Sequence, residues 1–332
     1  MAGVEIFSRI NVGKETVKGT AVARTRRFYG VAAGNFDIGD VYNFHETENR
    51  GQRVRLSART PTLLREVPTL KIQDSDGIAY DDLVLPFSVG CKGGLTGVGA
   101  GADKVWTITP SMTATNSLES MSVDVGDDVQ NWVLDYGQLS RWMLSTTFGE
   151  KTHFEGDLFA QQATKGAASA PAENTGPIIP SDLWTVKFAS TVAGLTGASV
   201  NANFLRTWSF EYLNGLKPRW YQDGNTFFGQ SVETDIVGTL QMEVESLALG
   251  VSEFVDKQRA GTLDCVRLKA QGPVLGGTFY SLQIDIPLYW DAVKPLASVD
   301  DGVNLYTVTG RLAYDVTNTF SMVLTNSLAA IP

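Results

Sequence analysis

Short runs in which apolar and polar residues alternate dominate the chain. From Trp208 to Tyr212, three aromatic residues alternate with Ser209 and Glu211. A period of two places successive side chains on opposite faces of an extended strand, so each run predicts a strand with one buried face. Asn-Gly and Asp-Gly pairs, which favour tight turns, separate the runs. The same alternation occurs at residues 121–125, 240–244, 282–286 and 312–316. The pattern predicts a mainly β protein.

Helical spacing occurs in two places. Between Val244 and Val255, apolar residues recur every three or four positions, which predicts an amphipathic helix that ends near Gly261. A second pattern, over residues 78–89, predicts another helix, although Pro86 disfavours its later part.

The length of 332 residues and an internal repeat predict two domains. Residues 67–72, which include Leu70, resemble residues 237–242, which include Leu240, and 240 − 70 = 170 residues is close to half the chain. A competing offset of 208 − 142 = 66 relates Trp142 to Trp208. We prefer the longer offset because it preserves the order of strand and helix. The expected division is an N-terminal arm (1–27), a first domain (28–162), a linker rich in Ala, Gly, Ser and Pro (163–182) and a second domain (183–332).

The net charge of −9 is unevenly distributed. Residues 1–27 carry six basic and two acidic side chains, or 6 − 2 = +4, so the remainder carries −9 − 4 = −13. An acidic body repels nucleic-acid phosphates, which disfavours sequence-specific DNA binding. A basic arm on an acidic body could attract copies of the same chain, and a solvated, partly disordered terminus is the alternative.

Residue patterns typical of enzymes and metal sites are missing from the sequence. The two cysteines, Cys91 and Cys265, are expected to be buried thiols, and two histidines, His45 and His153, offer no zinc-ligand spacing. No Gly-x-Ser-x-Gly motif occurs, and the glycine-rich residues 90–101 lack the ending of a phosphate-binding loop. We therefore expect no catalytic residues, no metal and no cofactor.

Targeting segments are also missing. Residues 1–14 contain no apolar run of signal-peptide length, and no stretch approaches the length of a membrane-spanning helix. These observations predict a soluble protein made in the cytoplasm, without a membrane partner.

The polar positions of the alternating runs are mostly acidic. Lys187 is an exception. The solvated face of half-buried sheets explains the alternation, but it explains the single sign of charge less well. An acidic sheet face would also suit a channel through which a polyanion slides without binding. The candidate residues for such a lining are Asp124, Glu211, Glu243, Glu245, Asp285 and Asp315.

In order and spacing, several segments resemble the major tail tube proteins of long, non-contractile-tailed bacteriophages. The segments resemble the N-terminal arm of that family, the strands of its first domain, the signature strand and turn of its second domain, and its last strand pair. They are residues 13–22, 105–111, 121–128, 205–216 and 310–328. Each is a loose pattern of strand and turn residues.

The resemblance implies two tandem tail-tube-type domains, each a β-sandwich or partial barrel with one flanking α-helix, preceded by an N-terminal arm. It implies that chains join edge to edge into rings, which stack into a virion tail tube assembled in the host cytoplasm. Two domains per chain imply trimeric rings with pseudo-sixfold symmetry, other tail proteins at the tube ends, and DNA that passes through the lumen without specific binding. Loops 43–65 and 212–235 and the arm are expected to contact neighbours. The expected contact residues are Arg9, Lys14, Lys18, Arg24, Arg26, Arg27, Arg50, Arg53, Arg55, Arg59 and Arg65.

Two other classes of function are compatible with a β-rich chain. One is a carbohydrate- or receptor-binding β-sandwich of a tail tip or fibre, in which Trp220, Tyr221 and residues 227–228 would form a sugar platform. The other is a hydrolase on a β scaffold, which the missing nucleophile and histidine patterns disfavour.

Overall fold

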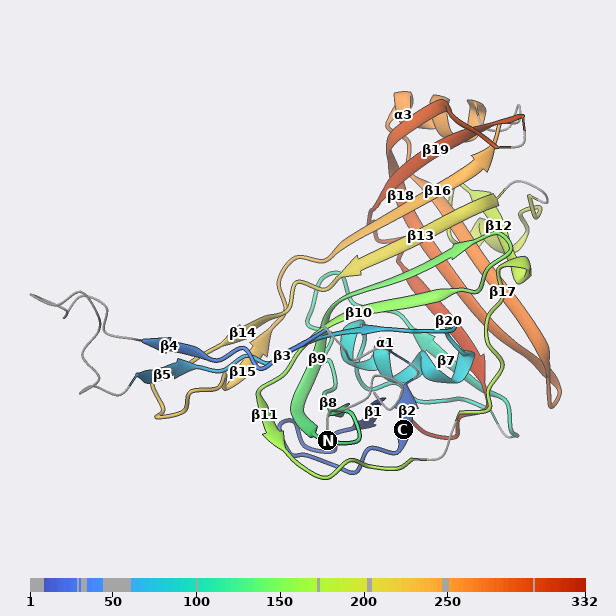
Figure 1. Cartoon of the computed structure of the whole chain (residues 1–332). Helices are drawn as coiled ribbons and strands as arrows, with labels where there is room; N and C mark the ends of the chain where they lie inside the picture. Colours follow the sequence, from blue (N-terminus) through green and yellow to red (C-terminus); the bar gives the residue numbers. More distant parts are fainter. Residues whose placement is uncertain are drawn as a thin grey trace, which may run out of the picture.

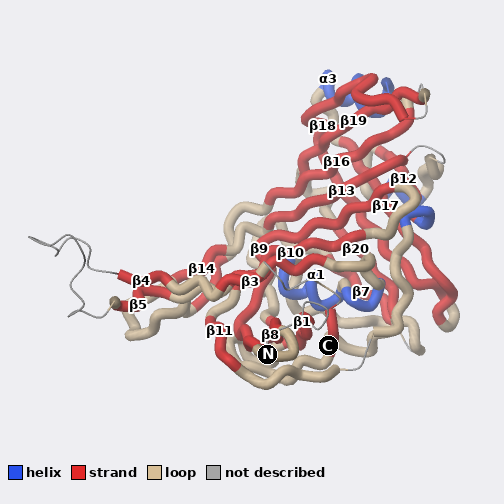
Figure 2. Tube along the Cα trace, viewed as in Figure 1, coloured by secondary structure: helices blue, strands red, loops and turns tan. Residues whose placement is uncertain are grey.

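The computed structural model describes residues 9–28, 30, 35–43, 61–99, 101–171, 174–201, 205–246, 251–300 and 302–332, with Asp300 described by its backbone alone. Strands dominate this part of the chain (Figures 1 and 2), which confirms the mainly β class. Sixteen strands form one connected sheet system, in which every pairing is antiparallel, and two short ribbons stand apart from it.

The first half of the chain, residues 9–165, contains eleven of the described strands and a short helical region. The strands are β1 (Arg9–Lys14), β2 (Arg26–Phe28), β3 (Phe36–Asp37), β4 (Val41–Asn43), β5 (Thr62–Arg65), β6 (Thr69–Gln73), β7 (Lys104–Ile108), β8 (Met121–Gly126), β9 (Asn131–Thr147), β10 (His153–Phe159) and β11 (Gln162–Lys165). Between β6 and β7 lie the 3₁₀ turn η3 (Tyr80–Asp82) and the helix α1 (Val84–Gly90).

The second half, residues 181–332, contains the remaining nine. They are β12 (Trp184–Ala189), β13 (Leu205–Leu213), β14 (Lys217–Arg219), β15 (Gln230–Val232), β16 (Val237–Glu245), β17 (Asp264–Leu275), β18 (Thr278–Asp300), β19 (Val303–Leu312) and β20 (Ser321–Asn326). The short helical elements are η4 (Ser181–Leu183), η5 (Ala193–Thr196), the π-helical η6 (Val251–Asp256) and α3 (Lys257–Ala260).

The two halves repeat one scheme of strand pairing. In the first half, neighbouring strands follow the order β3-β6-β10-β9, and in the second half the order is β13-β16-β19-β18. A ribbon connects the first two strands of each set along the chain, β4–β5 in one half and β14–β15 in the other. Helical residues follow β6 and β16 in turn. The predicted offset of 170 residues aligns β6 with β16, whose residues Leu70 and Leu240 are both buried.

Each half also contains one long strand that takes part in two parts of the sheet. The N-terminal portion of β9 pairs with β8 and β11, and its C-terminal portion pairs with β10 and β13. The N-terminal portion of β18 pairs with β17 and β20, and its C-terminal portion pairs with β19. Register shifts interrupt both long strands, and such bulges bend a strand from one sheet into another.

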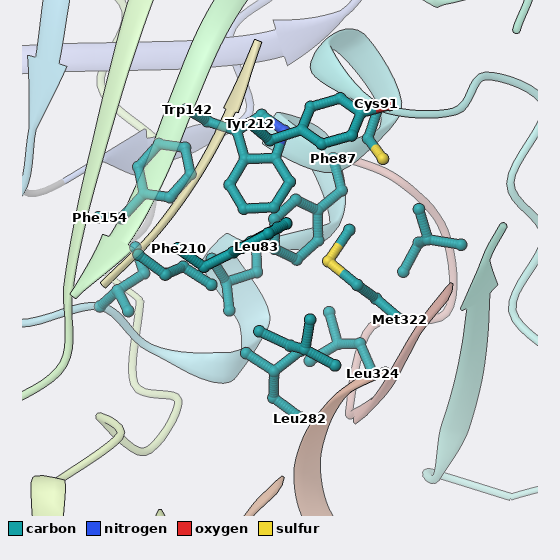
Figure 3. Close-up of a cluster of buried hydrophobic side chains, with 14 of the residues drawn as sticks. Leu83, Phe87, Cys91, Trp142, Phe154, Phe210, Tyr212, Leu282, Met322 and Leu324 are labelled. Carbon is teal, nitrogen blue, oxygen red and sulfur yellow. The ribbon is translucent and has the colours of Figure 1, made fainter. Parts of the chain in front are cut away.

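The halves share a continuous sheet and one hydrophobic core. β9 pairs with β13, and β7 of the first half pairs with β20 of the second. In Figure 3, Trp142, Tyr212 and Met322 meet near α1 in a buried cluster that draws on both halves. The rings of Trp142 and Tyr212 stack with centroids 5.2 Å apart, and the ring of Phe320 lies 5.5 Å from that of Tyr212. The division into two domains at the expected boundaries remains a prediction.

Both expected helices are present in part. α1 is completely buried, and Pro86 lies in its first turn, where the missing N–H of proline costs no helical hydrogen bond. The prediction of a helix from Val244 is wrong at its start, because β16 continues to Glu245 in register with β19. Helical structure begins by Val251 and ends at Gly261, which has a positive φ of 59°.

The expected linker, residues 163–182, is bound to the first half rather than free. Ile178 and Pro180 form β-bridges with Ala79 and Lys151, and residues 172–173 lie outside the described part. Trp184, directly after it, donates an indole N–H to the Thr152 hydroxyl at 2.8 Å. Buried backbone groups of this segment therefore have protein partners, which fixes its path across the first half.

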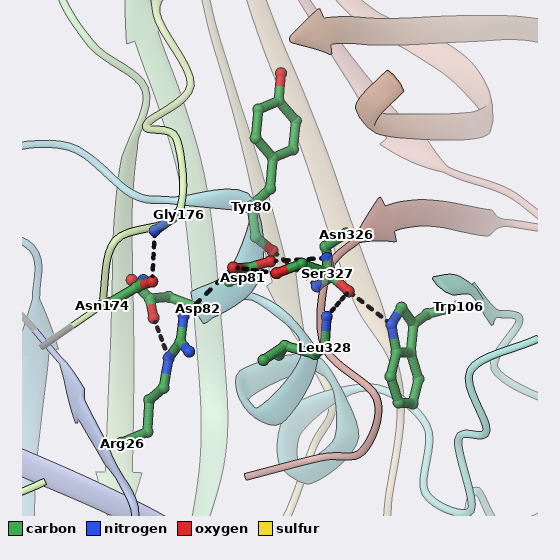
Figure 4. A network of polar contacts seen from close by, with 10 residues as sticks. All are labelled: Arg26, Tyr80, Asp81, Asp82, Trp106, Asn174, Gly176, Asn326, Ser327 and Leu328. Atoms are coloured by element: carbon green, nitrogen blue, oxygen red, sulfur yellow. Dashed lines mark hydrogen bonds and ion pairs between the residues drawn. The ribbon is translucent and has the colours of Figure 1, made fainter. Parts of the chain in front are cut away.

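A polar network joins the start of the chain to its end (Figure 4). Arg26 on β2 contacts Asp82 at 2.9 Å, and the neighbouring Asp81 accepts a hydrogen bond from the Ser327 hydroxyl at 2.9 Å. Asn326 accepts the Trp106 indole N–H at 2.8 Å and donates to the Tyr80 carbonyl at 3.2 Å. The network fixes β2, η3, β7 and the end of β20 to one another.

Candidate functional site

One face of the joined sheet is polar along all eight strands from β3 to β18. On β13, the buried Trp208, Phe210 and Tyr212 point into the core, so the alternate residues Ser209 and Glu211 point to the other side. Directly paired residues share a face, so the register extends this side across both halves. One row of paired residues runs Gln73, Glu155, Met143, Glu211, Thr239, Arg311. We call this side the open face.

Hydroxyl and amide side chains occupy the middle of the open face. They form a shallow groove of about 300 Å³ where β9, β13, β16 and β19 run side by side. Its open-face lining is Ser145, Thr147, Thr207, Ser209, Gln241, Glu243 and Thr307. These small polar side chains can exchange hydrogen bonds with water, and they offer neither an apolar pocket nor a cluster of basic groups to a ligand.

Arginines and lysines neutralise much of the acidic charge on this face. Arg141 on β9 forms ion pairs with Glu211 and, at 3.8 and 3.5 Å, with Glu155 and Asp157. Burial lowers the pKa of Arg141, but the bond to Glu211 and the nearby carboxylates outweigh burial and raise it. The other pairs are Lys71–Glu155, Arg206–Glu245 and Arg311–Asp291.

The open face is therefore weakly acidic. With Glu243, Asp37 and Lys294 included, seven acidic and five basic side chains lie on or beside it, so the sum is 5 − 7 = −2. The expectation that the polar positions of the strands carry acidic residues and very few basic ones is wrong. The basic partners lie one strand away, so a pattern read along single strands does not connect them to the acids.

Three of the six expected lining residues lie together on the open face. These are Glu211, Glu243 and Glu245, which lie on the paired strands β13 and β16. Glu245 is held by Arg206 at 2.7 Å, and Glu243 accepts a hydrogen bond from the Thr207 hydroxyl at 3.4 Å.

The other three do not lie there. Asp124 is fully buried on β8 and pairs with Arg24 at 2.7 Å, and Asp285 is buried on β18, where Arg267 binds both carboxylate oxygens at 2.6 and 2.8 Å. Asp315 follows the end of β19 in a turn, where hydrogen bonds from Asn318 and from backbone N–H groups lower its pKa. The expectation of a common lining is wrong for these three, because burial or a turn occupies their carboxylates.

The described basic residues of the arm bind their own chain in four cases. Arg24 and Arg26 pair with the buried Asp124 and Asp82, Lys14 pairs with Glu119 at 3.2 Å, and Arg9 donates to a backbone carbonyl. Arg24 and Arg26 are therefore engaged within the chain, and contact of the arm with a neighbouring chain stays a prediction. Lys18 is exposed, Arg27 has a partner within the protein, and Arg50, Arg53, Arg55 and Arg59 lie outside the described residues, as does His45.

A buried carboxylate fixes the arm to the first half. Glu15 is 2% exposed, and its two oxygens accept hydrogen bonds from the Gly19 and Tyr136 N–H groups, both at 2.8 Å, and from the hydroxyls of Ser120 and Ser122 at 2.5 and 3.0 Å. Four donors compensate for the burial of its charge. Residues 9–20 are therefore part of the folded body rather than a solvated terminus.

Two ribbons project together from the sheet (Figure 1). The ribbon β4–β5 lies beside β14–β15, and the Glu66 N–H donates to the Thr226 carbonyl at 3.0 Å between the segments that carry them. The guanidinium of Arg65 lies 5.3 Å from the centre of the Trp220 ring. Apart from Val41 and Tyr42 of β4, these ribbons fall within the two loops that we expect to contact neighbouring chains, and contact with a neighbour stays a prediction.

The proposed sugar platform is not formed by the aromatic residues of β14–β15. Phe228 is fully buried and packs against Tyr136, Phe159 and Trp220. Tyr221 is half exposed, at 50%. A stacking platform for sugars needs several exposed rings in one plane, so the residues named for this alternative do not support it.

The remaining candidate chemistry is structural. Cys91 and Cys265 are buried free thiols, as expected, and burial raises the pKa of Cys265 to about 12. His153 bonds Asp74 at 2.7 Å at the start of β10. Within the described ranges, no cluster of three or more His, Cys, Asp or Glu side chains could hold a metal. The described helices include none with the length and apolar character needed to cross a membrane.

Sequence reasoning missed Arg141, the centre of the charge cluster, although its position beside Trp142 in an alternating run could have indicated a basic residue on the solvated face. It also missed that Asp37 on β3 and Lys294 on β18 lie on the two end strands of the open face, because nothing in a sequence marks which strands end a sheet.

No family model and no curated protein matches the chain.

Proposed function

We propose that this chain is a structural subunit of a phage tail tube, in which rings of subunits stack into a conduit for DNA. The observation that carries the proposal is the joined sheet. Two halves with the same pairing scheme contribute four strands each to one continuous surface, which has a packed core on one side and the weakly acidic open face on the other.

The strand count supports a tube of suitable width. Three chains supply 3 × 8 = 24 strands. Strands about 4.8 Å apart and tilted by about 40° then close into a barrel of roughly 48 Å between backbones. Side chains of about 5 Å on each wall leave roughly 38 Å, which is wider than a DNA duplex. Closure also removes the sheet edges, which would otherwise promote aggregation.

The chemistry of the open face supports passage rather than binding. Proteins that bind DNA through its phosphates use clusters of Lys and Arg. Four of the basic side chains on or beside the open face are engaged by carboxylates, and hydroxyl groups line the central groove. We expect a hydrated, weakly repulsive wall. In this proposal, the projecting ribbons β4–β5 and β14–β15 contact an adjacent ring or subunit, and the chain is structural rather than catalytic.

Electron microscopy of the purified protein across a concentration series tests the proposal. We expect rings about as wide as the calculated barrel plus its outer layer, and stacked rings or tubes at high concentration. A chain that stays a monodisperse monomer at every concentration and binds glycans would overturn the proposal in favour of a tail-tip or fibre component.

A further inference from the structure

The junction between the two halves has a defined register. β9 and β13 pair in antiparallel fashion, with Trp142 opposite Tyr212 on the core side and Met143 opposite Glu211 on the open face. The stacked rings of Trp142 and Tyr212 and the ion pair between Arg141 and Glu211 stabilise this junction. The edge of β13 thus meets the edge of the long strand of the other half.

The repeated pairing scheme leaves the same two kinds of edge at the ends of the joined sheet. β3 holds the position in the first half that β13 holds in the second, and the C-terminal part of β18 holds the position of β9. Among the strands that the structure describes, none pairs with the outer edge of β3 or with the edge of β18 beyond Leu288.

The register identifies equivalent residues at these edges. Asp37 of β3 pairs with Thr69, and Glu211 of β13 pairs with Thr239. The 170-residue offset aligns the two threonines, so Asp37 is the equivalent of Glu211. Lys294 of β18 pairs with Thr307, and Met143 of β9 pairs with Glu155 at the corresponding position. Lys294 is therefore the equivalent of Met143. Because Glu211 faces Met143 at the internal junction, a second junction of the same register places Asp37 opposite Lys294.

The two edges are complementary in charge and in apolar character. Asp37 and Lys294 are both exposed and lie on the open-face side of their strands. The same register places Ile38 opposite Val293, which packs against the hydrophobic core. Gln258 of α3 bonds the Asp291 carbonyl at 2.9 Å at the start of this edge. An oppositely charged pair and an apolar pair at adjacent positions favour one register over its neighbours.

We infer that the edge of β3 pairs with the C-terminal edge of β18 in a second copy of this chain, in the register of the internal β9–β13 junction. The inference rests on the proposed function and specifies how its subunits join. Two different edges of the chain meet, so the interface is heterologous and repeats from chain to chain until a ring closes. Every junction around the ring, within a chain or between chains, then has nearly the same geometry.

Cysteine cross-linking tests the register. The double variant Asp37→Cys, Lys294→Cys should give a ladder of covalent oligomers under mild oxidation or with a short thiol cross-linker, because directly opposed strand residues lie within disulfide range. The matched control is Asp37→Cys with Tyr289→Cys: Tyr289 pairs with Arg311 of β19, four residues from Thr307, so one thiol moves about 13 Å along the same edge. The native Cys91 and Cys265 are 1% and 0% exposed, so they contribute little background.

Charge reversal gives a second readout that needs no cross-link. Asp37→Lys alone and Lys294→Asp alone should each raise the protein concentration at which rings form by about fivefold, because like charges then face each other. The double reversal should return it to within about twofold of the original. Circular dichroism checks that each variant is folded.

The outcomes separate the inference from the proposed function. Rings of the unmodified chain, with a ladder from the 37–294 pair alone and rescue by the double reversal, support both. Rings without that ladder, or with equal ladders from both cysteine pairs, overturn the register and leave the proposed function standing. An unmodified chain that forms no ring at any concentration overturns both.

Discussion

Arg141 and Glu211 form an ion pair across the junction of β9 and β13, where the two halves of the chain meet. The same guanidinium contacts Glu155 and Asp157 on β10. A single basic side chain therefore compensates three carboxylates, which come from the two strands on either side of β9.

Replacing Arg141 with methionine should lower the free energy of unfolding by about 1–2 kcal/mol, since three carboxylates are left to repel each other at a partly buried site. The loss should be larger at low salt, where repulsion is less screened. Urea denaturation at two ionic strengths measures it. The matched control is Arg311→Met, because Arg311 and Asp291 are 70% and 46% exposed and such pairs contribute little. Equal losses in the two variants would contradict the central role of Arg141.

Replacing Glu15 with alanine should destabilise the protein by about 3 kcal/mol, because it leaves buried N–H and hydroxyl donors without an acceptor. Guanidinium denaturation measures the change, and proteolysis near residue 20 should become faster as the segment detaches. Glu150→Ala, at an exposed position in the turn before β10, serves as the control and should cost little. If Glu15→Ala lost less stability than Glu150→Ala, the N-terminal arm would be held by its strand pairing alone.

Asp135 should make the free energy of unfolding fall as the pH rises from its pKa in the unfolded chain to its pKa in the folded chain. Burial and the nearby Glu15 raise its pKa from 3.8 to about 6 in the folded chain, so the folded state binds a proton that the unfolded state has released. That contribution is complete below the unfolded pKa near 4 and is lost by the time pH passes about 6.

Asp135→Asn removes this titration. Because the side chain is half-buried, we expect the variant to gain about 1 kcal/mol over the original chain between pH 4 and pH 7. Denaturation curves at several pH values for both proteins give the difference. A constant difference across this range would show that Asp135 titrates normally.

Glu243→Lys should convert the open face from weakly repulsive to attractive for DNA in assembled tubes. The replacement lies in the hydroxyl-lined groove, and its effect should fall steeply between about 50 and 200 mM salt, as phosphate binding does. Co-sedimentation of short duplexes with tubes measures it, with Glu150→Lys as a control for added charge elsewhere. Unchanged DNA retention at low salt would place Glu243 away from the lumen.

Local patterns in the sequence predicted the strands well, because alternation reports which side chains enter a core. The run from Trp208 to Tyr212 became β13, and the offset of 170 residues aligns Leu70 with Leu240, which are both buried on strands of the same pairing scheme. The charged sites were predicted less well. Asp124 and Asp285 satisfy the same alternation as Glu211, but both are buried and neutralised by arginines from other segments of the chain. Such pairings depend on register between distant segments, which one-dimensional patterns do not contain.

The pairing of β7 with β20 has a consequence for the order of events during synthesis. Trp106 on β7 opposes Leu324 on β20, and the Lys14 N–H bonds the Pro332 carbonyl at 2.7 Å. A ribosome that has delivered the first half must add nearly all of the remaining sequence before these partners exist. Until then, the edge of β7 and the apolar side of α1 lack their cover, and long-range pairing of this kind is slow to form and exposed to aggregation. We therefore expect the nascent first half to need protection by chaperones until β20 pairs with β7.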